Sequence, residues 1–215
     1  MTSPKSTNIS NILMLNLAVL LISTSGALGR YITLDPIITI FYRCVLAAVI
    51  FYMYCQWQRI SLKIASKKDV LKVISGGLLM GAHWVTYFYS LKYSSVAIAL
   101  LSLFTYPVIT AFLEPLLFKT RFNKIHVALG FLVLFGVYFL SPDFDLENNS
   151  FIAVLFGIAS AVFYSLRNLL MKKEIERYNG STLMFYQILV VALVLSPAFF
   201  YSEVDKVLEQ WKPLL

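Results

Sequence analysis

The stretch PIITIFYRCVLAAVIFYMY, residues Pro36–Tyr54, decides the fold class of this chain. It is a continuous apolar run that contains one guanidinium, at Arg43. At about 1.5 Å per residue, a helix of this length crosses a hydrocarbon layer of about 30 Å. The stretch therefore predicts a membrane-spanning helix.

Similar runs recur along the whole chain, whose 215 residues are 59% hydrophobic and 13% charged. A soluble domain has about 25% charged residues, so a soluble globular protein is excluded. The runs do not alternate as barrel strands do, which predicts an all-α membrane protein whose first partner is the lipid bilayer. The first run lacks a cleavage pattern, and we expect it to be retained. We expect seven spans, at Ile9–Gly29, Pro36–Trp57, Val70–Lys92, Ser94–Phe118, Ile125–Leu140, Phe151–Met171 and Ser181–Tyr201.

The basic residues gather in alternate loops, which explains the net charge of +7 without a nucleic-acid partner. The opposite set of loops includes SPDFDLENNS, with three acidic residues and no basic one. By the positive-inside rule, we expect a multi-pass protein of the inner (cytoplasmic) membrane with a cytoplasmic amino terminus. The basic set comprises Lys5, Arg59, Lys63, Lys67, Lys68, Lys72, Lys119, Arg121, Lys124, Lys172, Lys173 and Arg177.

The acidic loop divides the chain after five spans, into residues 1–140 and an incomplete second unit, 151–215. Because five is an odd number, a second copy of a five-span unit in the same chain has the opposite orientation in the membrane. The segments ITIFYRCVLAAVIF and TLMFYQILVVALVL align Arg43 with Gln187. These residues lie about 10 Å and 9 Å from the starts of their spans, at opposite faces. This placement predicts an inverted repeat, the architecture of many secondary transporters.

Several segments resemble the EamA domains of the drug/metabolite transporter superfamily. They are SGALGR (residues 25–30), Pro36 with Arg43, SLKYSSVAIALLSLFTYPVITAFLEPLLFK (90–119) and ALGFLVLFGVYFL (128–140). The resemblance is good over the first 140 residues and partial beyond. It implies ten helices in two inverted five-helix repeats, which export or exchange a small organic solute by alternating access.

The resemblance also implies that helix eight begins where this chain ends, at EQWKPLL. We therefore expect a truncated product, inactive alone, or a protomer completed by a second chain or by a homo-oligomer. A glutamate that many relatives carry thirteen residues beyond the proline falls here on Thr120. Its role is therefore not transferred to Glu114.

Candidate site residues are polar groups within the predicted spans, where ionisable side chains are functional hypotheses by default. Arg43 either lines a vestibule for an anionic solute or clamps backbone carbonyls. His83, beside Trp84 and Tyr87, either relays protons or bonds a hydroxyl or carbonyl across the bundle. Glu114 and Arg167 share a depth, so they either pair or reach water separately.

A second group of candidates combines small polar residues with tyrosines. Ser102, Tyr106 and Tyr164 form either a polar path or a tight helix interface. Pro107 removes a backbone hydrogen bond just below Ser102. Gly77 and Gly81 form a GxxxG pattern that predicts the close approach of another helix.

No metal cluster, phosphate-binding loop or nucleophile with its base occurs in the sequence, so we expect neither a cofactor nor an enzyme. Cys44 and Cys55 are interpreted as packing residues. A transporter is the leading hypothesis. The alternative is a non-transporting membrane scaffold or sensor subunit.

Overall fold

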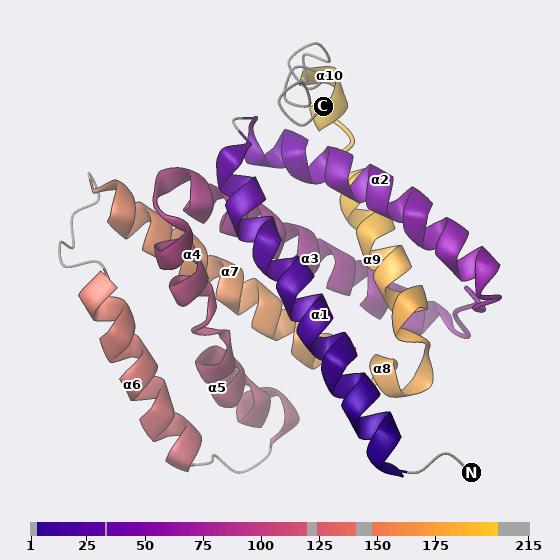
Figure 1. Cartoon of the computed structure of the whole chain (residues 1–215), viewed down its shortest axis with the longest axis horizontal. Coiled ribbons are helices and arrows are strands. Elements are labelled where there is room, and N and C mark those ends of the chain that lie inside the picture. The colour runs from indigo at the N-terminus through magenta and orange to yellow at the C-terminus, as the bar shows by residue number, and fades with distance from the viewer. Residues whose placement is uncertain (1–3, 33, 120–123, 141–147, 202–215) are drawn as a thin grey trace.

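The structure is a computed structural model that describes residues 4–32, 34–119, 124–140 and 148–201 (Figure 1). Every regular element within these ranges is a helix, in agreement with the expected all-α membrane protein. The helices are α1 (Pro4–Tyr31), α2 (Pro36–Trp57), α3 (Lys67–Tyr93), α4 (Val96–Leu103), α5 (Tyr106–Phe118), α6 (Lys124–Leu140), α7 (Asn149–Met171), α8 (Glu174–Arg177), α9 (Gly180–Val194) and α10 (Ala198–Tyr201).

Four segments of the described chain are long and apolar enough to cross a membrane: Asn11–Gly29, Pro36–Trp57, Val96–Phe118 and Asn149–Met171. Three further predicted spans correspond to α3, α6 and α9. Of these, α6 and α9 have 17 and 15 residues, and α3 carries charged residues at both ends.

Two predicted spans are not continuous helices, and a proline accounts for each break. The span Ser94–Phe118 divides into α4 and α5 because Pro107 has no N–H for the carbonyl of Leu103, four residues earlier. At the break, the Thr105 hydroxyl donates to the Ser102 carbonyl at 2.7 Å. The span Ser181–Tyr201 divides in the same way at Pro197, where α9 ends and α10 begins.

The core lies around α3, which packs against α7 and α9, while α2 packs against α9. Its buried side chains include Ile40, Met80, Leu91, Ile188 and Val191. Figure 1 shows α1 crossing one face of this core and α6 at the edge of the molecule. The exposed apolar side chains of α1, such as Leu13 and Leu21, fit a lipid-facing surface.

Glycines set the closest helix contacts. A Cβ atom on Gly77 would lie 2.7 Å from Val190, and one on Gly81 would lie 3.3 Å from Val191. The GxxxG prediction is therefore confirmed, and α9 is the helix that approaches. Gly157 of α7 is closer still, because its Cβ atom would lie 2.4 Å from the Cβ atom of Ser102 on α4.

With α4 and α5 taken as one broken span, successive spans run in opposite directions, so the described parts of the basic loops gather at one end of the molecule (Figure 1). We call this end, formed by residues 58–66, 119 and 172–179, the basic end. The beginnings of α2, α4 and α7 lie at the opposite end.

Candidate functional site

The centre of the site is a buried polar pair between α3 and α7. The Nδ1 atom of His83 lies 2.8 Å from the Ser160 hydroxyl and 3.2 Å from the Ser160 carbonyl. His83 is 6% exposed and Ser160 is fully buried. Ser160 is eleven residues from the start of α7, or about 16 Å along the helix, so the pair lies near the middle of the bundle.

The hydrogen bonds of Ser160 favour one tautomer of the His83 ring, with the hydrogen on Nδ1. The Ser160 hydroxyl donates its single proton to the backbone carbonyl of His83 at 2.9 Å. It therefore accepts from Nδ1, which carries a hydrogen. Among the described residues no partner is found for Nε2, so this atom remains available as an acceptor in the neutral ring.

Aromatic rings extend from the histidine in a continuous row. The His83 ring is stacked 6.4 Å from Tyr87 and lies 4.8 Å from Tyr164, and Tyr164 meets Tyr106 edge to face at 4.9 Å. We call these four residues, from α3, α5 and α7, the aromatic row. The Ser165 hydroxyl donates to the Tyr106 carbonyl at 2.9 Å and ties α5 to α7 beside the row.

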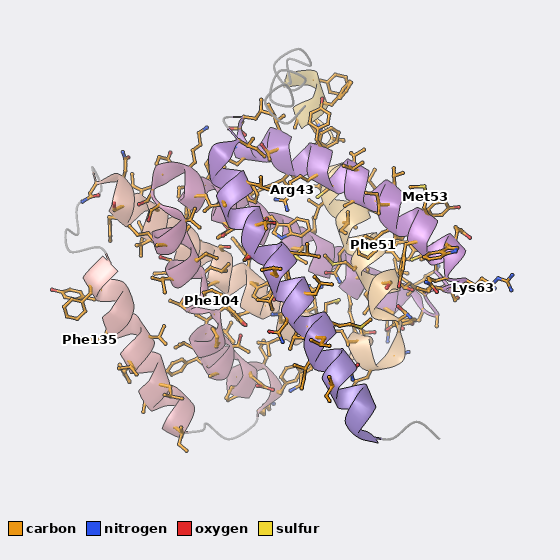
Figure 2. All side chains as sticks on the ribbon, in the orientation of Figure 1. Arg43, Phe51, Met53, Lys63, Phe104 and Phe135 are labelled. Atoms are coloured by element: carbon orange, nitrogen blue, oxygen red, sulfur yellow. The ribbon has the colours of Figure 1, made fainter. Side chains whose placement is uncertain are left out.

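Arg43 lies outside this row, nearer the end opposite the basic loops. Its guanidinium lies 5.0 Å from the ring centroid of Phe88 and donates to the Ser25 hydroxyl at 3.3 Å. Figure 2 shows the side chain between α1 and α2. Its contacts are a ring and a hydroxyl, rather than the backbone carbonyls of the alternative hypothesis.

A small pocket of about 260 Å³ is lined in part by Phe88, the ring that the Arg43 guanidinium contacts. Phe88, Lys92 and Thr39 are among its lining residues, and Thr39 is one helical turn from Arg43 on α2. The Thr39 hydroxyl is buried and has no hydrogen-bond partner in the described part of the chain.

Arg167 and Gln187 are brought together, whereas Glu114 and Arg167 are not. The Nε atom of Arg167 donates to the Gln187 side-chain oxygen at 2.8 Å, and its NH1 group donates to Asn168 at 3.0 Å. Glu114 instead forms an ion pair with Lys172. The hypothetical Glu114–Arg167 pair is therefore wrong, because Lys172, one residue beyond α7, takes the carboxylate.

The remaining candidates, Ser102, Trp84 and Pro107, lie in helix contacts or at a helix break. Ser102 is fully buried against Gly157, and its hydroxyl has no partner among the described residues. Trp84 packs against the hydrophobic core rather than in the aromatic row. Pro107 stands at the start of α5, at the helix break.

A second polar cluster lies at the basic end, where sequence reasoning placed no site. The buried carboxylate of Glu174 pairs with Lys72 at 2.5 Å and with Arg177 at 3.7 Å. The buried carboxylate of Asp69 accepts from the Tyr178 hydroxyl at 2.7 Å and from Arg177 at 3.1 Å. The Tyr178 hydrogen bond and the charge of Arg177 hold the pKa of Asp69 below its usual value. We call these five residues the ion cluster.

The sequence did contain a signal for this cluster. Asp69 and Glu174 are acidic residues within loops that are otherwise basic, and each lies close to a helix start. In the described residues no group of three or more His, Cys, Asp or Glu side chains is suited to hold a metal ion.

Comparison with known proteins identifies the family. Residues 9–141 match the model of the EamA-like transporter family. An uncharacterized transporter of Helicobacter pylori strain J99 is 28% identical over 149 residues, which cover 67% of this chain and 48% of the relative. An uncharacterized transporter of Bacillus subtilis strain 168, YxxF, is 24% identical over 186 residues, or 84% of this chain and 59% of the relative.

The chain thus spans about half the length of the curated relatives that it matches. No solved structure matches it. The family model covers more than half of the chain, and the matched region contains α2, α3, α4 and α5, with His83 and Tyr106 of the aromatic row. This chain belongs to the EamA-like transporter family.

Proposed function

We propose that the chain moves a small organic solute across the cytoplasmic membrane by alternating access, with the aromatic row in the solute path. The observation that carries the proposal is the buried His83–Ser160 pair in the interior of an apolar bundle, where the Nε2 atom has no partner among the described residues. Ionisable groups in such positions are typical of substrate and ion pathways. The names of the relatives favour a transporter over an enzyme.

The residues of the path suggest how a solute would be held. The faces of Tyr87, Tyr164 and Tyr106 suit apolar or aromatic groups, and His83 Nε2 can accept a hydrogen bond. Arg43, beside the 260 Å³ pocket, would meet an anionic group at the entrance.

Alternating access requires two repeats that move against each other. We propose residues 1–140 as the first repeat, with α7 and α9 as part of a second, inverted one. The basic loops support a cytoplasmic amino terminus.

Cysteine accessibility tests the path without knowledge of the solute. In a background with Cys44→Ala and Cys55→Ala, Tyr164→Cys should react with a small hydrophilic thiol reagent, because a solute path admits water. The matched control is Ala161→Cys, one turn away on α7 at a fully buried position, which should not react. A non-transporting scaffold or sensor predicts no reaction at either position.

Transport itself is tested by flux into vesicles that contain the purified chain. A panel of labelled aromatic acids, amino acids and nucleosides should include a solute that accumulates above empty vesicles. His83→Phe should reduce that flux about tenfold or more, since removal of a hydrogen-bonding group from a buried site costs about 1–3 kcal/mol. Tyr138→Phe, on the exposed surface of α6, is the control. No flux would refute transport by this chain unaided, and equal flux in both variants would refute a role of His83 in the solute path.

A further inference from the structure

A groove with a volume of about 670 Å³ lies at the basic end, away from the aromatic row. Its walls are the segment 62–65, the first turns of α3 and the middle of α9. The lining is mostly apolar and includes Ile64, Val70, Ile74 and Val190, with Lys63 on the segment 62–65.

Hydrogen bonds fix the non-helical wall of this groove. The Thr182 hydroxyl donates to the Ser61 carbonyl, and the Tyr186 hydroxyl donates to the Leu62 carbonyl, both at 2.9 Å. The Ala65 N–H donates to the Tyr178 hydroxyl at 3.1 Å. Because its backbone is held at three points by the α8–α9 region, the segment forms a fixed wall.

The groove extends from the loop region into the depth of the membrane. Val190 is ten residues from the start of α9, and Ile74 is seven residues from the start of α3. These positions correspond to about 15 Å and 10 Å along the helices. The groove thus has one end at headgroup level and the other among hydrocarbon chains.

Positive charge is concentrated at the headgroup end. Arg59, Lys63, Lys67 and Lys68 are exposed, and no ion pair to any of them occurs in the part of the chain that the structure describes. The nearest carboxylate in sequence, Asp69, is already bound by Arg177 and Tyr178. Figure 2 shows Lys63 at the periphery of the molecule.

We propose that this groove binds one anionic phospholipid of the adjoining leaflet. An acyl chain lies against Ile64, Ile74 and Val190, and the phosphate is held by Lys63 with the neighbouring cations. Basic pockets between membrane helices recognise anionic headgroups in this way. The site is independent of the solute path, because it shares no residue with the aromatic row.

Native mass spectrometry of the purified full chain tests the site. The detergent-solubilised protein is incubated with phosphatidylglycerol or with phosphatidylcholine of the same acyl chains. We expect phosphatidylglycerol to be retained as one tight equivalent, about fivefold or more in preference to phosphatidylcholine, because each basic residue near an anionic surface contributes about 1 kcal/mol. Excess glycerol phosphate should not displace it, since the headgroup alone does not fill the groove.

Two substitutions remove the two parts of the site. Lys63→Glu should lower phosphatidylglycerol retention about fivefold or more, whereas Lys119→Glu, on another loop of the basic end, should not. Ile74→Trp fills the groove and should lower retention, whereas Leu78→Trp, one turn farther along α3 and outside the lining, should not. Val70→Trp is a second filling variant in case Ile74→Trp does not fold.

Equal retention of the two lipids would overturn the proposal. So would displacement by glycerol phosphate, or loss of lipid that is the same in the variants and their controls.

Discussion

At the scale of single residues, the His83–Ser160 pair shows how a titratable side chain is accommodated in an apolar bundle. One hydroxyl satisfies the Nδ1–H of the ring and the carbonyl of the same histidine. The ring is thereby fixed in one orientation, with Nε2 directed away from the pair. An orienting partner of this kind is what a binding site requires of its supporting residues.

Asp69 gives a prediction on pH. Because the folded-state pKa of Asp69 lies below its unfolded value of about 3.9, its ionised form stabilises the fold above about pH 5. This contribution is lost as the pH falls through the folded-state pKa. Thermal unfolding in detergent should therefore show wild type more stable than Asp69→Asn at pH 6, and the difference should shrink towards pH 3.

The control for this experiment is Glu176→Gln, at an exposed position on α8. It should follow the wild type at every pH. A difference between wild type and Asp69→Asn that stays constant from pH 6 to pH 3 would contradict the interpretation of the ion cluster.

The failed Glu114–Arg167 pair shows which information the sequence lacks at this scale. Residue counting along two helices predicts their depths, and both residues do lie toward the basic end. It does not predict how each helix is rotated about its axis, which depends on packing. Glu114 pairs with Lys172 and Arg167 donates to Gln187, and the packing of α5, α7 and α9 decides these pairings.

At the scale of elements, close contacts at glycine positions hold the helices together. The contact of Gly157 with Ser102 joins α7 to α4, and the contact of Gly77 with Val190 joins α3 to α9. In a membrane, where apolar surface gains little from leaving lipid, such close packing is a main source of helix association.

Two glycine substitutions test this mechanism. Gly157→Ala should lower the free energy of unfolding by about 1–3 kcal/mol, because its Cβ atom would lie 2.4 Å from Ser102 Cβ and the helices must separate. Gly136→Ala, in α6, meets no atom within 4 Å and should be neutral or stabilising by up to about 1 kcal/mol. Circular dichroism during SDS titration measures both, and equal effects of the two would contradict the packing argument.

The helices also show which structural features a sequence pattern can predict. Apolar length and the GxxxG spacing predicted the helices and one of their close contacts. Prolines marked both helix breaks, yet a proline can also sit in a kinked but continuous helix. At the α4–α5 break the Thr105 hydroxyl also donates to the Ser102 carbonyl, a local bond that hydropathy does not report.

At the scale of the whole molecule, antiparallel helices place all basic loops at one end. The charge pattern of the sequence already implied this arrangement. It could not predict the ion cluster, because residues 69, 72 and 174–178 are distant in sequence and meet only when α3, α7 and α9 pack. The residues of the aromatic row were candidates in two separate groups, and their contacts with one another depend on the same packing.

Labelling of intact cells tests the orientation of the molecule. In the background without Cys44 and Cys55, Lys92→Cys should react with a membrane-impermeant maleimide from outside, because its side chain is 53% exposed at the end opposite the basic loops. Lys63→Cys, at the basic end, should react only after the cells are lysed. The reverse pattern would contradict a cytoplasmic amino terminus, and labelling of both in intact cells would contradict a transmembrane bundle.

The ion pairs and the close glycine contacts that hold this bundle differ in their response to ionic strength. Added electrolyte screens the half-exposed cations Lys72 and Arg177, and so partly weakens their pairing with the buried carboxylates that join α3 to the α8–α9 region. The fit of Gly157 against Ser102 involves no charge and is indifferent to ionic strength. The ionic composition of the compartment that the basic end faces therefore acts on that end alone, while the interior contacts keep their spacing.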